Sequence, residues 1–249
     1  MKSLGIDIGS RTIKVVVLTA GRISEREVVD ATSSPAETAR GLLAKYPGIP
    51  AVATGYGRNL PAIDDIPSVT EIKACARGIR YCCADARTVI DIGGQDVKAI
   101  LLDSNGRIAK FEMNDRCAAG TGRFIEIMAE KLGFELSGFG DAAREGRPGT
   151  AISSVCAVFA ESEVIGLLNK GVPREDVARA VHQSVAGKLA GMYKRLGSPC
   201  STVFLAGGGA LNSCTKSLLE DRLRVSVAVP SNPQTVVALG AAVIAGQGR

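Results

Sequence analysis

The stretch Asp91–Leu102, with the sequence DIGGQDVKAILL, decides the fold because it repeats the earlier stretch Asp7–Leu18, DIGSRTIKVVVL, without a gap. Asp, Ile, Gly, Lys and Leu are identical in the two copies, and most other positions agree in size and polarity. Once one extra residue is allowed, a Gly-Arg-Ile tripeptide follows each copy, at Gly21–Ile23 and Gly106–Ile108. This agreement indicates an internal duplication, and it disfavours the alternative of two unrelated sheets whose turns match by chance.

Each copy predicts the same local structure. An apolar strand ends in Asp-x-Gly, a tight polar turn leads to a second apolar strand, and a glycine-containing hairpin turn leads to a third. Asn105-Gly106 is typical of a type I′ turn. Small residues and hydroxyls in the Asp-x-Gly turns let backbone N–H groups approach an anion closely, and the Asp can face that anion through a cation. Two such turns predict a phosphate clamp.

The remaining sequence alternates predicted helices with short strands, so we expect an α/β chain of two duplicated lobes that join near residue 80, with nucleotide in the cleft between them. The predicted connecting helices cover residues 35–45 and 68–83. Further predicted helices cover residues 122–132, 159–169, 176–196 and 235–245, and another ends at Leu223. A strand over residues 49–54 leads into Gly55-Tyr56-Gly57-Arg58.

Composition excludes several classes of protein. Of the 249 residues, 46% are apolar and 4% aromatic, which excludes intrinsic disorder. The net charge of +5 comes from scattered Lys and Arg without interleaved aromatics, so we expect no nucleic-acid partner. The longest apolar stretch, Val236–Gly246, is shorter than the roughly 18 residues that span a bilayer. Seven cysteines without a secretory signal predict a reduced, cytoplasmic, membrane-free protein.

Five motifs carry a family resemblance that covers nearly the whole chain. They are Gly5–Ser10, Ala53–Arg58, Asp91–Asp96, Asn114–Phe124 and Val158–Val164. The chain resembles the actin-like (ribonuclease-H-like) ATPase superfamily. It is most similar there to the activases (component A) of 2-hydroxyacyl-CoA dehydratases and the ATPase subunits of benzoyl-CoA reductase. This resemblance implies lobe I at residues 1–80, to which a C-terminal helix at 234–249 returns, and lobe II at residues 81–233.

The activity that the resemblance implies is ATP-dependent electron transfer. A homodimer would hold one [4Fe-4S] cluster through Cys117 and Cys156 of each subunit, and ATP hydrolysis to ADP would drive one electron into an iron-sulfur dehydratase or reductase of CoA esters. Ferredoxin or flavodoxin would supply that electron. Both cysteines precede predicted helices, whose N-termini stabilise thiolates and an anionic cluster. On spacing alone, both remain compatible with small buried side chains, because the chain has no Cys-x-x-Cys pair.

The resemblance also assigns nucleotide contacts. Asp7 would orient Mg²⁺ through water, and Asp91 with Gln95 would position the attacking water for phosphoryl transfer. The β- and γ-phosphates would lie on Ser10, Arg11, Thr12, Ile13 and Lys14. The other expected nucleotide-binding residues are Gly93, Gly94, Gly120, Thr121, Gly122, Gly207, Gly208, Gly209, Asn212 and Gln234. A solvated Lys14 without a phosphate role is the alternative at that position.

Two other functions fit parts of the sequence. A small-molecule kinase would use the same phosphate turns but would have no use for Cys117 and Cys156. A nucleotide-dependent switch or chaperone-like module would need a peptide-binding domain that the sequence does not show. His182, the single histidine, is either a catalytic base or, more simply, a packed or surface side chain. Cys75 stands where the family usually has His, and we expect it and Cys82, Cys83, Cys200 and Cys214 to serve in packing.

Overall fold

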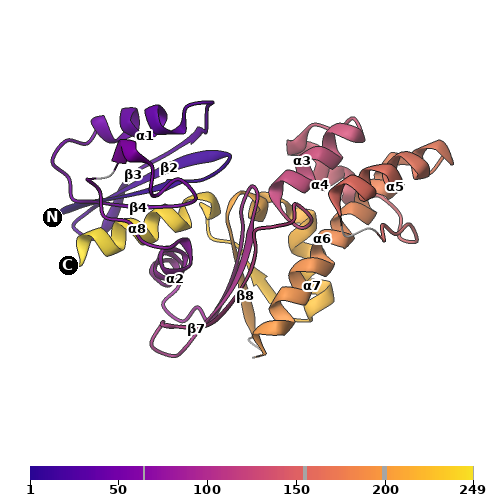
Figure 1. The fold of residues 1–249 in the computed structure, drawn as a ribbon. Coiled ribbons are helices and arrows are strands. Elements are labelled where there is room, and N and C mark those ends of the chain that lie inside the picture. The colour runs from indigo at the N-terminus through magenta and orange to yellow at the C-terminus, as the bar shows by residue number, and fades with distance from the viewer. Residues whose placement is uncertain (64, 154–155, 198–200, 249) are drawn as a thin grey trace. The chain divides into compact units, whose positions relative to one another are not determined.

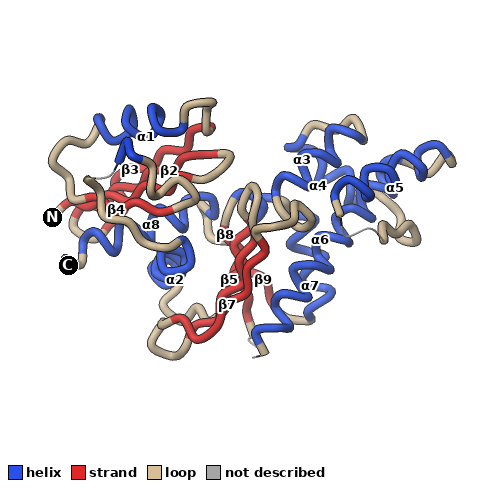
Figure 2. The backbone as a smooth tube through the Cα atoms, viewed as in Figure 1, coloured by secondary structure: helices blue, strands red, loops and turns tan. Residues whose placement is uncertain are grey.

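The structure is a computed structural model that describes residues 1–63, 65–153, 156–197 and 201–248. The chain is a mixed α/β protein with two sheets (Figures 1 and 2). It divides into two compact units. Unit 1 comprises Met1–Val89, Ile100–Phe111 and Val229–Arg249, and unit 2 comprises Ile90–Ala99 and Glu112–Ala228. Within the described residues, no helix combines the length and apolar character that crossing a membrane requires.

Unit 1 contains the first sheet, in the order β3-β2-β1-β4. The strands are β1 (Lys2–Ile8), β2 (Thr12–Thr19), β3 (Arg22–Asp30) and β4 (Ala51–Thr54). β1 pairs antiparallel with β2 and parallel with β4. The helices of this unit are α1 (Pro35–Ala44), α2 (Glu71–Cys82) and α8 (Val236–Gly246), with 3₁₀ turns η1 (Pro61–Ile63) and η3 (Pro233–Thr235).

Alternate residues of β2 explain why that strand is a continuous apolar run. Val15 and Val17 belong to one core cluster with Ala39 and Leu42 of α1. Val16 and Leu18, on the opposite face of the strand, pack instead with Ala238, Leu239 and Ala242 of α8. A strand with both faces covered needs apolar side chains at every position. The first sheet is therefore packed between α1 and the C-terminal helix α8.

The two hairpin turns of the duplication differ. Ala20 (φ 52°) and Gly21 (φ 76°) both have positive φ, as a type I′ turn requires. In the second copy only Gly106 does (φ 75°), and its N–H donates to the carbonyl of Asp103 (3.0 Å). The Asp103 carboxylate also accepts from the N–H groups of Asn105 and Arg107 (2.9 and 2.8 Å). The type I′ prediction at Asn105-Gly106 was wrong, because this side chain stabilises a longer turn.

The second sheet has the order β7-β6-β5-β8-β9, so its first four strands repeat the arrangement of the first sheet. These strands are β5 (Thr88–Ile92), β6 (Val97–Leu102), β7 (Ile108–Asn114), β8 (Thr202–Ala206) and β9 (Ser226–Ala228). The helices of unit 2 are α3 (Gly122–Lys131), α4 (Leu136–Glu145), α5 (Ala157–Asn169), α6 (Arg174–Leu196) and α7 (Ser213–Leu223), with η2 (Gly208–Leu211). The long helix α6 contacts each of the other four α-helices.

Glycines set the distance of α8 from its neighbours in unit 1. A Cβ at Gly240 would lie 1.7 Å from the Ala74 carbonyl oxygen of α2, and a Cβ at Gly78 would lie 1.9 Å from the Val236 carbonyl oxygen. On the sheet side, a Cβ at Gly5 would lie 2.0 Å from the Ala238 carbonyl oxygen. Backbone therefore packs directly on backbone at both faces of α8.

We expect Gly240→Ala to lower the free energy of unfolding by at least about 3 kcal/mol, because the added methyl overlaps a backbone carbonyl that cannot rotate away. Urea unfolding followed by circular dichroism measures this change. Gly138→Ala in α4 is the matched control, since a Cβ there meets nothing within 4 Å. In a helix interior that replacement stabilises by roughly 0.5–1 kcal/mol. Equal stability of the two variants would contradict the packing.

Candidate functional site

The Asp-x-Gly turn of unit 1 is closed by one ion pair and one backbone hydrogen bond. Asp7 lies directly opposite Lys14 in the β1–β2 register, and the Lys14 Nζ is 3.0 Å from the Asp7 Oδ2. The Gly9 N–H donates to the carbonyl of Thr12 (3.1 Å), which closes the turn that contains Ser10 and Arg11. The Lys14 side chain is 14% exposed, so it is not a solvated surface lysine.

The equivalent turn of unit 2 is built in the same way but carries one more carboxylate. Lys98, 2% exposed, lies 2.6 Å from the Asp96 Oδ2 and 3.8 Å from the Asp91 Oδ2. The Gly93 N–H donates to the carbonyl of Asp96 (2.9 Å), just as Gly9 donates to Thr12. Lys98 and Asp96 align with residues of the first copy but are not among the predicted site residues, although the buried lysine pairs with both acids of this turn.

A glycine follows the fourth strand of each copy and contacts the aspartate of the same unit. A Cβ at Gly55 would lie 2.6 Å from the Asp7 Oδ1 and 2.5 Å from the Ile8 carbonyl oxygen. A Cβ at Gly207 would lie 2.5 Å from the Asp91 Oδ1 and 2.4 Å from the Ile92 carbonyl oxygen. The duplication therefore extends to β4 and β8. The shared Gly-x-Gly at 55–57 and 207–209 was the available sequence signal for this second repeat.

The segment that carries Cys117 is hydrogen-bonded to the Asp-x-Gly turn of unit 2. The N–H groups of Gly122 and Arg123, the first residues of α3, donate to the carbonyls of Gly93 (2.9 Å) and Gly94 (2.8 Å). The Thr121 hydroxyl donates to the Ala118 carbonyl (2.6 Å). The Asn114 side-chain amide donates to the Cys117 carbonyl (2.9 Å). Residues 114–123 thus form one bonded segment, and the Gly122 N–H is already committed to Gly93.

The two candidate cluster cysteines differ in their relation to the following helix. Cys156 is the N-cap residue of α5, whereas the N-cap of α3 is Thr121, four residues beyond Cys117. Both cysteines precede helices, as predicted, but only Cys156 lies directly at a helix N-terminus, because the turn at residues 118–121 separates Cys117 from α3. Both thiols are partly exposed.

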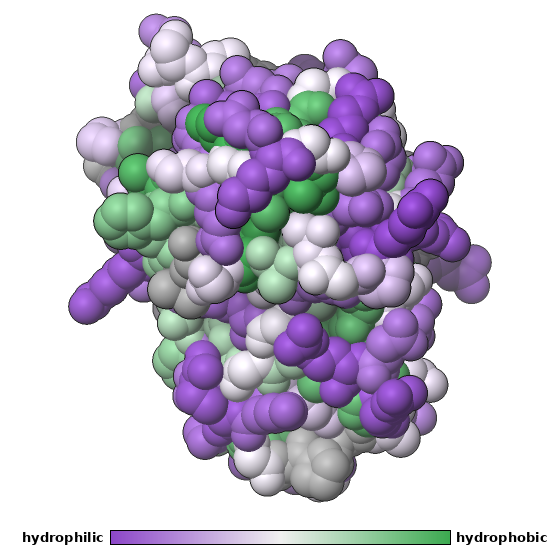
Figure 3. All heavy atoms as spheres, turned by 90° about the vertical axis from the view of Figure 1, so that its right-hand side faces the viewer, coloured by the Kyte–Doolittle hydropathy of each residue, from purple (hydrophilic) through white to green (hydrophobic). Residues whose placement is uncertain are grey.

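The surface next to Cys156 is apolar. Val158 and Phe159, in the first turn of α5, are 70% and 68% exposed. Figure 3, which views the molecule from the side where α5 lies in Figure 1, shows green apolar atoms among purple charged ones on this face. An ion pair between Lys131 and Glu161 (2.7 Å) joins α3 to α5.

His182 and Asn212 form a buried hydrogen-bonded pair in unit 2. The Ala178 carbonyl can only accept, so His182 carries its proton on Nδ1 and donates it there (2.8 Å). Its Nε2 then accepts from the Asn212 Nδ2 (2.9 Å), and the Asn212 Oδ1 accepts from the Thr215 N–H at the start of α7 (2.9 Å). His182 also packs on the Phe139 ring. The packed interpretation of His182 fits this geometry, and Asn212 caps α7.

The remaining cysteines sit in ordinary packing or surface positions. Cys75 and Cys214 are buried, Cys82 is exposed and Cys83 is intermediate. The predicted helix at residues 68–83 includes both Cys82 and Cys83. Cys83 instead follows the end of α2 in an extended conformation, so that prediction was wrong for Cys83. Burial raises the pKa of the Cys214 thiol, which favours the unreactive protonated form. Cys200 lies outside the described residues.

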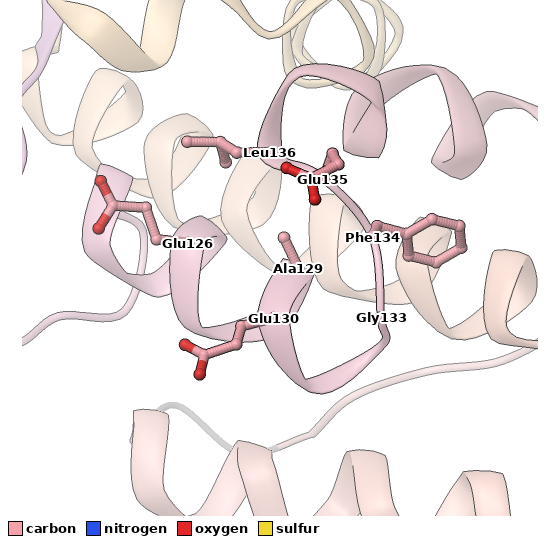
Figure 4. Close-up of a pocket in the computed structure, with 7 residues that line it drawn as sticks. All are labelled: Glu126, Ala129, Glu130, Gly133, Phe134, Glu135 and Leu136. Atoms are coloured by element: carbon pink, nitrogen blue, oxygen red, sulfur yellow. The ribbon is translucent and has the colours of Figure 1, made fainter.

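A pocket of about 460 Å³ lies between α3 and α4 and is unsuited to phosphate. Figure 4 shows Glu126, Glu130 and Glu135 around it, together with Phe134 and Leu136. Three carboxylates repel a triphosphate. Among the residues that the structure describes, no group of three or more His, Cys, Asp or Glu side chains is placed to hold a metal ion.

The geometry described above can be compared with known proteins. The model of the BadF/BadG/BcrA/BcrD ATPase family matches residues 4–245. The chain belongs to this ATPase family. It is similar to the activator of lactoyl-CoA dehydratase from Anaerotignum propionicum, with 43% identity over 98% of this chain and 97% of the relative.

Two solved structures extend the comparison with this ATPase family. One is the activator of the 2-hydroxyisocaproyl-CoA dehydratase from Clostridium difficile with bound ADPNP, with a TM-score of 0.90, 38% identity and coverage of 99% and 95% of the two chains. The other is the Acidaminococcus fermentans (R)-2-hydroxyglutaryl-CoA dehydratase component A, with a TM-score of 0.91, 37% identity and coverage of 99% and 98%. The predicted family and actin-like α/β fold class are confirmed.

Replacing Lys98 tests the buried acids of this ATPase. We expect Lys98→Met to cost about 3–5 kcal/mol of unfolding free energy, because it leaves the Asp91 and Asp96 carboxylates without their buried cation. Lys14→Met, which removes the more exposed lysine of the first turn, should cost less. Urea unfolding curves of both variants measure the difference. A Lys98 variant as stable as the wild type would contradict the arrangement.

His182 should make the stability of the protein pH-dependent. Burial lowers the pKa of His182, so the folded state binds this proton less well than the unfolded chain, whose histidine pKa is about 6.5. Stability is therefore fully present above about pH 6.5 and falls as the pH drops below it, by at most about 1.4 kcal/mol per pH unit. We expect His182→Gln to flatten this slope in urea unfolding between pH 7.5 and 5.5. An unchanged slope would contradict the buried neutral imidazole.

Proposed function

We propose that this ATPase is an activator that couples ATP hydrolysis to transfer of one electron into an iron-sulfur dehydratase or reductase of CoA esters. Three relatives that cover nearly the whole chain at 37–43% identity are named as activators of 2-hydroxyacyl-CoA dehydratases or as a component of one. These names support the activator hypothesis over a small-molecule kinase. A kinase also gives no reason for Cys117 and Cys156 to stand where they do.

The observation that carries the proposal is the bonded connection in unit 2 from the Asp-x-Gly turn to the Cys117 segment. Gly93 and Gly94 accept hydrogen bonds from the first two residues of α3, and Cys117 lies five residues before that helix. A phosphate that binds or leaves this turn shifts the two carbonyls, and the shift passes through two short hydrogen bonds. Nucleotide state and cluster environment are coupled in this way.

The two Asp-x-Gly turns and the glycines beside them fit ATP and Mg²⁺. At Gly55 and Gly207 the backbone packs against Asp7 and Asp91 so closely that any side chain would overlap these aspartates. We assign the phosphates to Ser10–Lys14 and to Gly93 and Gly94, and the Mg²⁺ waters to Asp7. The remaining nucleotide contacts stay assigned to Gly120, Thr121, Gly122, Gly207, Gly208, Gly209, Asn212 and Gln234. Bound Mg²⁺ would neutralise phosphate charge during hydrolysis.

Within unit 2, the residues of this chain divide the work of hydrolysis. Lys98 holds the Asp91 and Asp96 carboxylates in fixed positions. We assign to Asp91 and Gln95 the orientation of the attacking water, since a carboxylate accepts and an amide donates or accepts its hydrogen bonds. Asp91 is 4% exposed, so it reaches that water without competition from bulk solvent.

The thiols fit a cluster only when two chains contribute. A [4Fe-4S] cluster takes four thiolates, and we assign Cys117 and Cys156 as the two from each chain. A two-fold homodimer then completes the set. The exposed Val158 and Phe159 next to Cys156 supply apolar surface that such a contact would bury. The bound cluster would carry the low-potential electron, with ferredoxin or flavodoxin as its source.

Anaerobic purification with iron analysis tests the cluster assignment. We expect a brown homodimer with about two iron atoms per chain, because four are shared. Cys117→Ser and Cys156→Ser should lose most of the iron and the visible absorption. The matched control is Cys82→Ser, which removes an exposed thiol and should keep both. A colourless wild-type protein that hydrolyses ATP would contradict the proposal and favour a kinase.

Stopped-flow electron transfer tests the coupling. With a reduced activator and a purified 2-hydroxyacyl-CoA dehydratase component, ATP should accelerate transfer strongly, whereas ADP should not. Transfer that proceeds equally fast without ATP would show that hydrolysis is not coupled to the electron.

A further inference from the structure

A row of three polar side chains crosses the first sheet at the end of β1. Asp7 is paired with Lys14 of β2 on one side and with Thr54 of β4 on the other. Residues paired across neighbouring strands project from the same face of a sheet. Gly5, two residues before Asp7 on this face, packs on α8. Lys14, Asp7 and Thr54 therefore line one face in that order.

Thr54 carries a buried hydroxyl that the described residues leave unsatisfied. The residue is 0% exposed, and its Oγ1 has no hydrogen-bond partner in the described part of the chain. An unpaired buried hydroxyl costs about 1–3 kcal/mol, so such groups in proteins normally hold a water or a ligand atom. Valine has the same shape and would avoid this cost. The hydroxyl at this position therefore points to a bound partner.

The neighbouring aspartate shows where that partner lies. Lys14 is bonded to Oδ2 of Asp7, while Oδ1 lies 2.6 Å from the position that a Cβ on Gly55 would take. Gly55 directly follows Thr54, and its backbone packs closely against Oδ1, which places this oxygen beside the chain segment that carries the threonine. A carboxylate oxygen and a hydroxyl together suit a water that is bound to a divalent cation. The carboxylate accepts a hydrogen bond from one O–H of that water, and the hydroxyl can accept one from the other O–H.

We propose that Thr54 is a positioning residue that holds, with Asp7, one water of the hydration shell of the Mg²⁺ that accompanies ATP. This inference rests on the proposed function, which assigns the Mg²⁺ waters to Asp7, and it adds a second protein group to them. Mg²⁺ gives up its waters reluctantly and is often held through them, so fixing one water fixes the ion.

The second copy of the duplication lacks this hydroxyl. Ala206 precedes Gly207 as Thr54 precedes Gly55, and both glycines contact the aspartate of their own unit in the same way. The first turn pairs one lysine with one aspartate and adds the threonine, whereas the second pairs Lys98 with two aspartates. Because of this difference, we assign the Mg²⁺-bound water to the first turn and the water that attacks the phosphate to the second turn.

Isothermal titration calorimetry with a non-hydrolysable ATP analogue tests the proposal. The affinity is measured once in the presence of Mg²⁺ and once in EDTA. The ratio of the two affinities measures how much the cation strengthens binding. Thr54→Val should reduce this ratio about tenfold, and Thr54→Ser should restore most of it, because serine keeps the hydroxyl. Affinity in EDTA should stay unchanged. Thermal unfolding without nucleotide should be unchanged or shifted upward in Thr54→Val, since an unsatisfied hydroxyl is removed.

Two further variants separate the possible failures. Thr215→Val removes the other buried threonine hydroxyl without a partner in the described chain, and it should leave the Mg²⁺ ratio intact. Asp7→Asn should lower the ratio at least as much as Thr54→Val. If Asp7→Asn lowers it and Thr54→Val does not, Thr54 holds only a structural water and this inference is overturned. If Asp7→Asn also leaves it intact, the assignment of Mg²⁺ to Asp7 fails. If Thr54→Val fails to fold, a wild-type ratio in Thr54→Ala overturns the inference.

Discussion

Two backbone hydrogen bonds, from Gly122 and Arg123 to the carbonyls of Gly93 and Gly94, are the interaction on which the account depends. They join a strand-end turn suited to phosphate with the start of α3 and the cysteine-bearing segment before it. Backbone groups cannot rotate away as side chains can, so a displacement of the turn moves the helix start. Unit 2 therefore brings its Asp-x-Gly turn and the segment that carries Cys117 into direct contact.

The duplication contains two copies of the same turn, and the two copies differ in their charged and polar residues. Both copies keep an aspartate opposite a lysine and a glycine beside the aspartate. Only the second adds a third charged group, Asp96, which pairs with the almost completely buried Lys98. Only the first has Thr54 beside its glycine. Polar groups this deeply buried need defined partners, which explains why each turn holds a fixed geometry.

The sequence predicted most of the fold because its signals were local. Apolar strands that end in Asp-x-Gly and helices with clear boundaries required no knowledge of distant contacts, so most elements lie within a few residues of their expected positions. Helix α4 was missed, since Gly138 and Gly140 weaken its helical pattern and its N-cap lacks a side-chain hydrogen bond. The turn at Asn105-Gly106 was mispredicted because the Asp103 carboxylate decides its geometry. The contacts of Gly55, Gly207 and Lys98 could not be predicted, because they depend on which strands pair in the sheet. The spacing of residues along the sequence does not determine that pairing.

Hydrogen exchange measured by mass spectrometry tests the coupling most directly. The intact protein would be compared in its ATP-analogue and ADP states, with the amides of Gly122 and Arg123 and the segment at residues 114–121 as the readout. We expect exchange in this segment to change together with exchange in the turn at residues 93–96. A change confined to the turns at residues 9–14 and 93–96, with the Cys117 segment unaltered between the two states, would contradict it.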